Sequence, residues 1–324
     1  MVYVELIIGS RNRVLMWLCA LAFLLGARVV NAQQDYRHYH QQVLKVEDQI
    51  MLENFDSATV LYHALFSEYE FVFQRDWWVG AQCAFISGED ELALKWLELG
   101  MKAGLEWREI KDFSLFRPLK KIDDWKSLEK EKADYRREYE TKLDSPPARK
   151  MEAMFREDQA LAFKSLFRFS ENKRNKFAEE VFAIQSEKHL QEIQKIIDLV
   201  GVPGERMVGE SIWLSVMLSH HNGISQDYSE KDTLYLKMKP ELLQAIQVGF
   251  LSPYVYGWVE DWYWSVLTQG AENAYGMLNA PDKVQQAEVN INRGRVGMRP
   301  WENEKRLNQV ERKYGLDLKL TRDL

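Results

Sequence analysis

The sequence predicts an all-α protein in which repeat-like helical hairpins are followed by a helical-bundle domain. Glycine and proline recur at helix-length rather than strand-length intervals, and seven glycines directly follow stretches of helical periodicity, where helix ends are expected. No Asn-Gly lies between alternating apolar residues, which is the pattern that marks a β-hairpin. The seven helix-ending glycines are Gly88, Gly104, Gly201, Gly223, Gly249, Gly270 and Gly315.

Composition excludes several classes of protein. The chain has 324 residues, a length typical of about two domains. Hydrophobic residues make up 46% and include 11 Trp, which excludes an intrinsically disordered chain. A net charge of -6 offers no basic footprint, so we expect no nucleic-acid partner. Two cysteines exclude a disulfide scaffold and a cysteine-rich zinc ribbon.

Residues 1–32 have the pattern of a signal peptide. Basic residues precede an apolar run at 14–26, which is shorter than the ~20 residues needed to span a bilayer. Small or modest residues at Val30-Asn31-Ala32 suit cleavage before Gln33. We therefore expect an exported protein, periplasmic or extracellular, with no stable membrane span after cleavage. A short uncleaved anchor is the alternative.

Cleavage would also change the charge and cysteine counts. The net charge would fall from -6 to about -8, and Cys83 would be the one cysteine left, so no internal disulfide could form. Cys83 has no basic neighbour in the sequence, and we predict a buried core residue rather than a nucleophile.

The first domain, expected at 33–143, shows paired amphipathic helices. In the second pair, small residues of one helix face bulky residues of the next, Gly88 lies at the turn and Ala93 at a close-packing position. This arrangement resembles tetratricopeptide helix pairs, with a degenerate third unit ending near Trp125. The resemblance implies either a concave groove for a peptide or a hairpin scaffold without a ligand. The expected helices are 36–53 paired with 57–70, and 76–87 paired with 90–102.

A linker is expected at 144–148. Residues 128–142 mix acidic and basic side chains at helical spacing, which indicates a solvated helix face. The consecutive prolines Pro146-Pro147 then prevent a helix from continuing. A second helical domain is expected at 149–316, followed by a short tail at 317–324.

Polar residues interrupt the apolar stripes of the second domain. Asp158 falls on the apolar stripe of the helix after the linker, where a carboxylate must be paired, hydrogen-bonded or protonated. Gln159 follows it directly. A later apolar helix, 210–221, ends in His220 and His221, where a histidine also suits the helix dipole.

Two further helices carry candidate polar residues. The helix after Ser252-Pro253 places Trp258 and Trp262 on one face, with Asp261 among them. Tryptophan at this spacing is more typical of packing than of a ligand cage. Arg293 lies close to the apolar seam of a helix expected at 282–296.

The order of motifs from Met151 to Leu316 resembles an uncharacterised bacterial family, a domain of unknown function. Its signature combines Asp-Gln, Gly-x-Pro…Val-Gly, a Gln-His-Ala-Asp helix end, Asp-Arg, Tyr-Gly and a terminal Arg…Gly-Leu. Ser219 replaces the glutamine before the family histidine, and Trp262 replaces the arginine after the family aspartate. The resemblance implies no established activity. The matching residues are Asp158, Gln159, Gly201, Pro203, Gly209, His220, Asp261, Tyr275 and Gly276, with Arg293 or Arg295 as the terminal arginine.

Two classes of function remain open. The first is a protein- or peptide-interaction module of the cell envelope, whose partner is another envelope protein or a peptide. The candidate binding residues are Gln159, His221, Trp258 and Trp262.

The alternative is a hydrolase-like enzyme. In it a histidine acts as general base, a carboxylate orients the ring, and an arginine binds an anion. The same residues could instead form a buried network that fixes helix register. The sequence has no metal motif, phosphate loop or nucleophile elbow, so we predict no metal and no cofactor. The catalytic candidates are Asp158, His220, Asp261 and Arg293.

Overall fold

The computed structural model describes residues 34–167 and 170–320, and from Asp35 onward these form one compact unit. Both described ranges consist of helices and connecting segments without a strand, which confirms the all-α prediction. The expected signal peptide at 1–32 lies outside the described residues, as do the last four residues of the expected tail.

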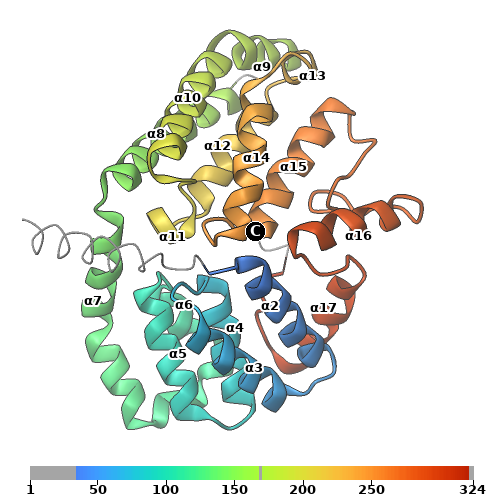
Figure 1. The fold of residues 1–324 in the computed structure, drawn as a ribbon. Coiled ribbons are helices and arrows are strands. Elements are labelled where there is room, and N and C mark those ends of the chain that lie inside the picture. Colours follow the sequence, from blue (N-terminus) through green and yellow to red (C-terminus); the bar gives the residue numbers. More distant parts are fainter. Residues whose placement is uncertain (1–33, 168–169, 321–324) are drawn as a thin grey trace, which may run out of the picture. The chain divides into compact units, whose positions relative to one another are not determined.

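The helices are consecutive, and most are joined by short connections (Figure 1). In the first half they are α2 (Tyr36–Met51), α3 (Phe55–Glu68), α4 (Gln74–Ile86), α5 (Asp90–Lys102), α6 (Trp107–Asp112) and α7 (Asp123–Leu143), with 3-10 turns at Ser114–Phe116 and Pro118–Lys121. In the second half they are α8 (Pro146–Leu166), α9 (Glu171–Phe177), a π-helical turn at Ala178–Phe182, α10 (Ala183–Val200), α11 (Glu205–Val208), α12 (Ile212–Asn222), α13 (Gln226–Ser229), α14 (Leu234–Gln247), α15 (Pro253–Leu267), α16 (Gln285–Val296) and α17 (Asn303–Tyr314).

The first four helices form two hairpins, α2 with α3 and α4 with α5. Their ends lie within about two residues of the positions expected from the sequence. Gly80 allows α4 to approach its neighbours, because an added Cβ would lie 2.9 Å from Phe66 and 3.2 Å from Trp96. Gly88 at the turn has a φ of +79°, a conformation that glycine adopts without strain. The specific likeness to tetratricopeptide repeats stays a prediction.

Two large hydrophobic cores and a small cluster of Phe182, Ala183 and Ile224 fill the compact unit. The first lies among α2–α7 and the second among α8–α15 and the segments that follow, while α7 runs alongside both groups of helices (Figure 1). Of the linker expected at 144–148, only Asp144 and the N-cap Ser145 lie between α7 and α8. Pro146-Pro147 begins α8 instead of interrupting it, because the first helical turn tolerates proline. The last part of the described chain packs against the first helices again. Leu307 of α17, and Leu318 and Leu320 after it, are buried in the first core. The division of the chain into two separate domains, at 33–143 and 149–316, stays a prediction.

The segment after α17 is held on α4 by its backbone. The side-chain amide of Gln82 accepts a hydrogen bond from the Asp317 N–H at 2.7 Å and donates one to its carbonyl at 2.8 Å. Trp78 Nε1 donates to the Asp317 carboxylate at 3.1 Å. Residues 317–320 and α17 therefore cover part of the first helix pairs, which we expected to border a peptide groove.

Six charged side chains of alternating sign connect the first core to the last part of the chain. Arg75 donates to Glu47 at 2.6 Å and to Asp76 at 3.1 Å. Glu47 and Asp76 are almost fully buried, so each needs a cationic partner, and the Arg75 guanidinium contacts both. In order of contact the six are Asp76, Arg75, Glu47, Arg299, Glu304 and Arg293.

The other half of this charge network is built around Arg299. Its Nη1 lies 3.1 Å from Glu47 and its Nε 3.3 Å from Glu304. The guanidinium also lies over the ring of Tyr254, 4.7 Å from the centroid, which adds a cation–π contact. Arg293 closes the series, donating to Glu304 at 2.9 Å. The network thus joins α2 and α4 to α16 and α17.

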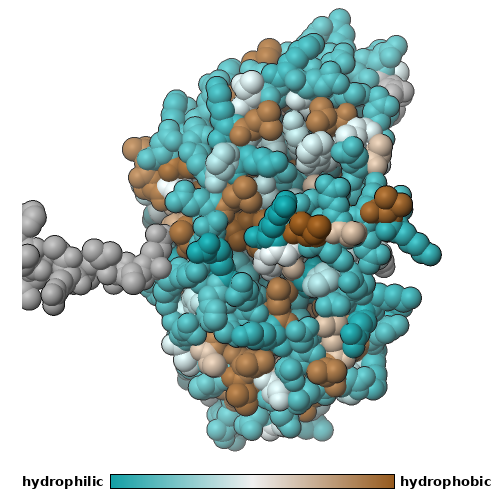
Figure 2. Space-filling view, turned by 45° about the vertical axis from the view of Figure 1, so that its right-hand side comes forward, coloured by the Kyte–Doolittle hydropathy of each residue, from teal (hydrophilic) through white to brown (hydrophobic). Residues whose placement is uncertain are grey.

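The outer surface is predominantly hydrophilic on the face shown in Figure 2, where apolar side chains form separate patches. Large apolar side chains are exposed at the end of α8, at Phe163, Leu166 and Phe167. Among the helices of residues 34–167 and 170–320, none is both long and apolar enough to cross a membrane.

Glu47 is the carboxylate that joins both halves of the charge network, so its substitution tests the network. Glu47→Gln should lower the free energy of unfolding by about 3–5 kcal/mol, because Arg75 and Arg299 would keep buried charges without their shared partner. Urea denaturation of the full chain measures this loss. The exposed neighbour Asp48, substituted as Asp48→Asn, is the control and should change stability little. Equal effects of the two substitutions would contradict the network's role.

Candidate functional site

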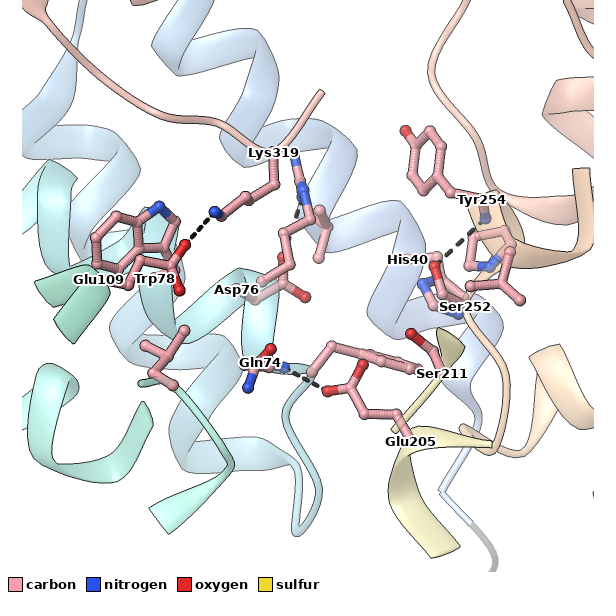
Figure 3. Close-up of a pocket in the computed structure, with 16 residues that line it drawn as sticks. His40, Gln74, Asp76, Trp78, Glu109, Glu205, Ser211, Ser252, Tyr254 and Lys319 are labelled. Atoms are coloured by element: carbon pink, nitrogen blue, oxygen red, sulfur yellow. Dashed lines mark hydrogen bonds and ion pairs between the residues drawn. The ribbon is translucent and has the colours of Figure 1, made fainter. Parts of the chain in front are cut away.

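A cavity of about 280 Å³ lies where the first helix pairs meet the second half of the chain (Figure 3). Its lining comes from α2, α4, the α6 region, the segment from α11 to α12, the start of α15 and the segment after α17. In Figure 3, Trp78 and Glu109 lie toward one end, while His40 and Ser252 lie toward the other. This size is at the small end of ligand pockets.

Much of the cavity wall is apolar. Two segments supply most of it: the start of α4 with the residue before it, and the start of α15, where Pro253 fits the first helical turn. An apolar wall favours a ligand with an apolar body. The apolar and aromatic lining residues are Val43, Phe73, Trp78, Leu105, Pro253, Tyr254 and Val255.

Four of the charged lining residues are already paired. Arg75 binds Asp76, and Lys319 forms an ion pair with Glu109. Asp76 also accepts a hydrogen bond from the hydroxyl of Tyr39 at 2.6 Å. Burial raises the pKa of Asp76, and the charge of Arg75 and the Tyr39 hydrogen bond oppose that rise. These pairs leave little free charge in this part of the cavity.

His40 is a buried lining residue with an unused nitrogen. Its side chain donates a hydrogen bond to the carbonyl of Ile246, while Nε2 has no hydrogen-bond partner among the described residues. The residue is only 6% exposed. Burial lowers the pKa of His40 to about 4, so the ring is neutral at neutral pH. With its proton directed to Ile246, the ring presents Nε2 as a bare acceptor.

Glu205 is the charged lining residue without a cationic partner. One carboxylate oxygen accepts a hydrogen bond from the Gln74 N–H at 2.6 Å. Within the described part of the chain, no ion pair reaches this carboxylate. Burial raises the pKa of Glu205 to about 8, against the effect of the Gln74 bond, and the charges of Asp76 and Glu210 add to the rise.

The predicted catalytic residues Asp158 and His220 do lie together. His220 Nδ1 is 2.6 Å from Asp158 Oδ2, and Gln159 donates to the same oxygen at 3.2 Å. Asp158 is 1% exposed, which confirms that it faces the core. The His220 side chain is 35% exposed and packs edge-on against Phe182. A buried carboxylate therefore orients a partly accessible imidazole.

Asp261 and Arg293 serve a different part of the structure. Asp261 accepts hydrogen bonds from the N–H groups of Ala274 at 2.9 Å, Tyr275 at 2.7 Å, and Met277. Arg293 donates to the carbonyl of Tyr275 at 2.9 Å. Both thus fix the segment after α15. In the residues that the structure describes, no hydrogen bond or ion pair joins them to the Asp158–His220 pair, so the four predicted catalytic residues form neither one site nor one network.

His221 belongs to a buried arrangement that sequence reasoning did not find. Its Nδ1 is 2.9 Å from the hydroxyl of Ser186, and its Nε2 is 3.4 Å from Asp232. Trp258 and Trp262 are partly buried, and their rings meet edge-to-face with centroids 6.5 Å apart. This contact is the packing role that their spacing favoured.

None of the eight candidate residues lines the cavity. The sequence nevertheless contains a pattern that points to the cavity residue His40. His40 and Glu47 are polar residues on the buried stripe of α2, with Tyr36, Val43 and Ile50. The same rule that selected Asp158, a polar side chain on an apolar stripe, applies to both. Glu205 could not be found in this way, since α11 is a single short turn without periodicity.

Neither the cysteine nor any metal-type cluster adds a reactive site. Cys83 is buried and unpaired, and burial raises its pKa to about 12, which confirms the prediction of a core residue. Across residues 34–167 and 170–320, no group of three or more His, Cys, Asp or Glu residues could hold a metal ion.

In comparisons with family models, curated proteins and solved structures, nothing matches the chain. The resemblances to tetratricopeptide pairs and to a domain of unknown function therefore stay predictions.

The raised pKa of Glu205 predicts a pH-dependent stability. Between its ordinary value of 4.5 and about 8, the folded protein holds a proton that the unfolded chain lacks, so stability falls as pH rises. Glu205→Gln should remove this penalty and be the more stable protein at pH 8. The advantage should grow by up to about 1.4 kcal/mol per pH unit from pH 5 to 8.

Urea denaturation at several pH values measures this difference. Glu230→Gln, at an exposed position, is the matched control and should show no such trend. If Glu205→Gln and wild type keep a constant difference across this range, the carboxyl group is not held uncompensated in the folded protein.

Proposed function

We propose that the protein is a binding protein whose small ligand occupies the cavity lined by His40 and Glu205. The observation that carries this proposal is the unpartnered Nε2 of His40, which is buried at the cavity wall. Leaving a buried polar atom without a partner costs about 1–3 kcal/mol. A ligand donor at this position would recover that cost.

The proposal narrows the interaction role expected from the sequence. An envelope protein or peptide lying along the first helix pairs would meet α17 and residues 317–320, which already pack there. The cavity instead admits a small molecule, or the terminal group of a larger one. We therefore favour a small ligand over an extended peptide.

The hydrolase-like alternative keeps one supporting observation, the 2.6 Å contact between His220 and Asp158. Such a pair has the geometry of an oriented general base. However, Asp261 and Arg293 are engaged with the segment after α15 and supply no anion clamp to this histidine. Binding in the cavity accounts for more of the unusual side chains than catalysis at His220 does.

Filling the cavity should abolish binding without unfolding the protein. Ser211 lines the cavity and is partly exposed, so Ser211→Phe adds a ring where the ligand would lie. Native mass spectrometry of the full chain, incubated with a small-molecule extract of its source cells, measures the retained ligand. Wild type should retain a ligand that Ser211→Phe does not.

The matched control is Ser215→Phe, one helical turn further along and outside the cavity lining. It should retain the same ligand as wild type, while circular dichroism shows that both variants are folded. Retention by Ser211→Phe, or no retained ligand in wild type, would contradict binding in this cavity.

We also infer that the protein is exported, on the basis of the apolar run at 14–26 and the small residues before Gln33. N-terminal sequencing of the protein recovered from periplasmic and secreted fractions should begin at Gln33. Recovery from the cytoplasm with an intact Met1 would contradict both export and cleavage.

A further inference from the structure

Two residues that line the cavity, His40 and Glu205, have acceptor capacity that the described chain leaves unused. Nε2 of His40 carries a lone pair without a donor among the described residues. The carboxylate of Glu205 receives only the Gln74 N–H from this part of the chain. Ser211 and Ser252 also line the cavity, and a hydroxyl can turn to donate or to accept. The polar group of a fitting ligand must therefore be rich in donors.

The charges of the lining residues favour a cation. Arg75 is matched by Asp76 and by Glu47 beyond the wall, and Lys319 is matched by Glu109. Glu205 is the remaining acidic lining residue, and no cationic side chain of the described chain pairs with it. A ligand with one positive charge would complete the pairing, whereas an anion would meet Glu205 and the nearby Asp76 without a free cationic side chain.

We propose that the cavity binds an organic ammonium ion on a small apolar body, with Glu205 as its counterion and Nε2 of His40 accepting one of its N–H bonds. This inference rests on the proposed function, since it names the chemical class of the ligand for the same cavity. The apolar part of the ligand would lie against Phe73, Val255 and the neighbouring apolar wall.

Binding of such a cation should release a proton. At pH 7 most Glu205 carboxyl groups hold a proton, because the pKa is about 8. As the ammonium group enters, the proton leaves Glu205 for the solvent and a carboxylate–ammonium pair remains. The apparent affinity should rise with pH up to about 8 and level off above it, until the amine itself loses its proton near pH 10.

Other ionisable groups near Glu205 can also influence its pKa and so the pH dependence of binding. Glu205 also borders a neighbouring surface hollow, which offers a route toward solvent. The titratable and charged residues that share the cavity, the hollow or the adjoining turn with Glu205 are His40, Arg75, Asp76, Glu109, Tyr254, Lys319, Glu70, Lys102, Glu138, Tyr139, Lys142, Arg206 and Glu210.

Isothermal titration calorimetry of the full chain with three matched probes tests the proposal. The probes are 2-phenylethylamine, the neutral 2-phenylethanol and the anionic 3-phenylpropanoate. The amine should bind roughly tenfold or more tightly than the alcohol, and the acid should bind most weakly. In buffers with different heats of ionisation, the amine should release nearly one proton at pH 7 and little at pH 9.

A pair of isosteric variants locates the counterion. Glu205→Gln keeps an oxygen for the Gln74 N–H but removes the charge, so the amine should lose roughly tenfold in affinity and all of its proton release. Alcohol binding should not change. Glu230→Gln, at an exposed position outside the cavity lining, should alter amine affinity by no more than about twofold.

The outcomes distinguish two hypotheses: that the cavity binds a small ligand, and that this ligand is an organic ammonium ion. If the alcohol or the acid binds as tightly as the amine, the cavity binds ligands but the ammonium class is overturned. If none of the three binds, the ammonium proposal fails, while ligand retention by wild type against Ser211→Phe still decides the proposed function. Amine binding that persists unchanged in Glu205→Gln would show that another site holds the cation.

Discussion

The docking of the first helices against the last part of the described chain depends on the alternating charge network that runs from Asp76 to Arg293. A buried ion network adds little net stability, because desolvation offsets most of the Coulomb attraction, but a misplaced member leaves a bare charge at a cost of several kcal/mol. Glu47 on α2 and Arg299 after α16 are far apart in the sequence, and both are almost fully buried. The network therefore selects one docking of the first helices against the end of the chain.

The cavity shares Arg75 and Asp76 with this network. Two other lining residues, His40 and Glu205, make the stability of the fold depend on pH in opposite directions. The lowered pKa of His40 means that stability is lost as pH falls from about 6.5 toward 4, since the unfolded chain takes up the proton first. The raised pKa of Glu205 means that stability is lost as pH rises from 4.5 toward 8. Burial thus keeps both His40 and Glu205 neutral only over an intermediate range, from about pH 4 to about pH 8.

Local sequence patterns predicted the helices well but could not predict their long-range contacts. The first two hairpins follow from periodicity and from Gly88, which are properties of neighbouring residues. The rule that a polar residue on an apolar stripe needs a partner identified Asp158, and it would also have identified His40. Contacts such as Gln82 with Asp317 join residues 235 positions apart and leave no local signature. Asp261 and Arg293 were rightly seen as unusual, yet their shared partner is the backbone of Tyr275.

The proposed ligand binding would be coupled to the docking of the two halves through the same side chains. Arg75 and Asp76 belong to the charge network and also line the cavity, and the charge of Asp76 acts on Glu205. A cation bound beside Glu205 would offset the repulsion that Asp76 exerts on Glu205 once this carboxyl group ionises. Because the residues that line the cavity range from His40 to Lys319, a ligand that fits it would bind only when both halves are docked. By mass action it would therefore stabilise the docking of the two halves as well as the site itself.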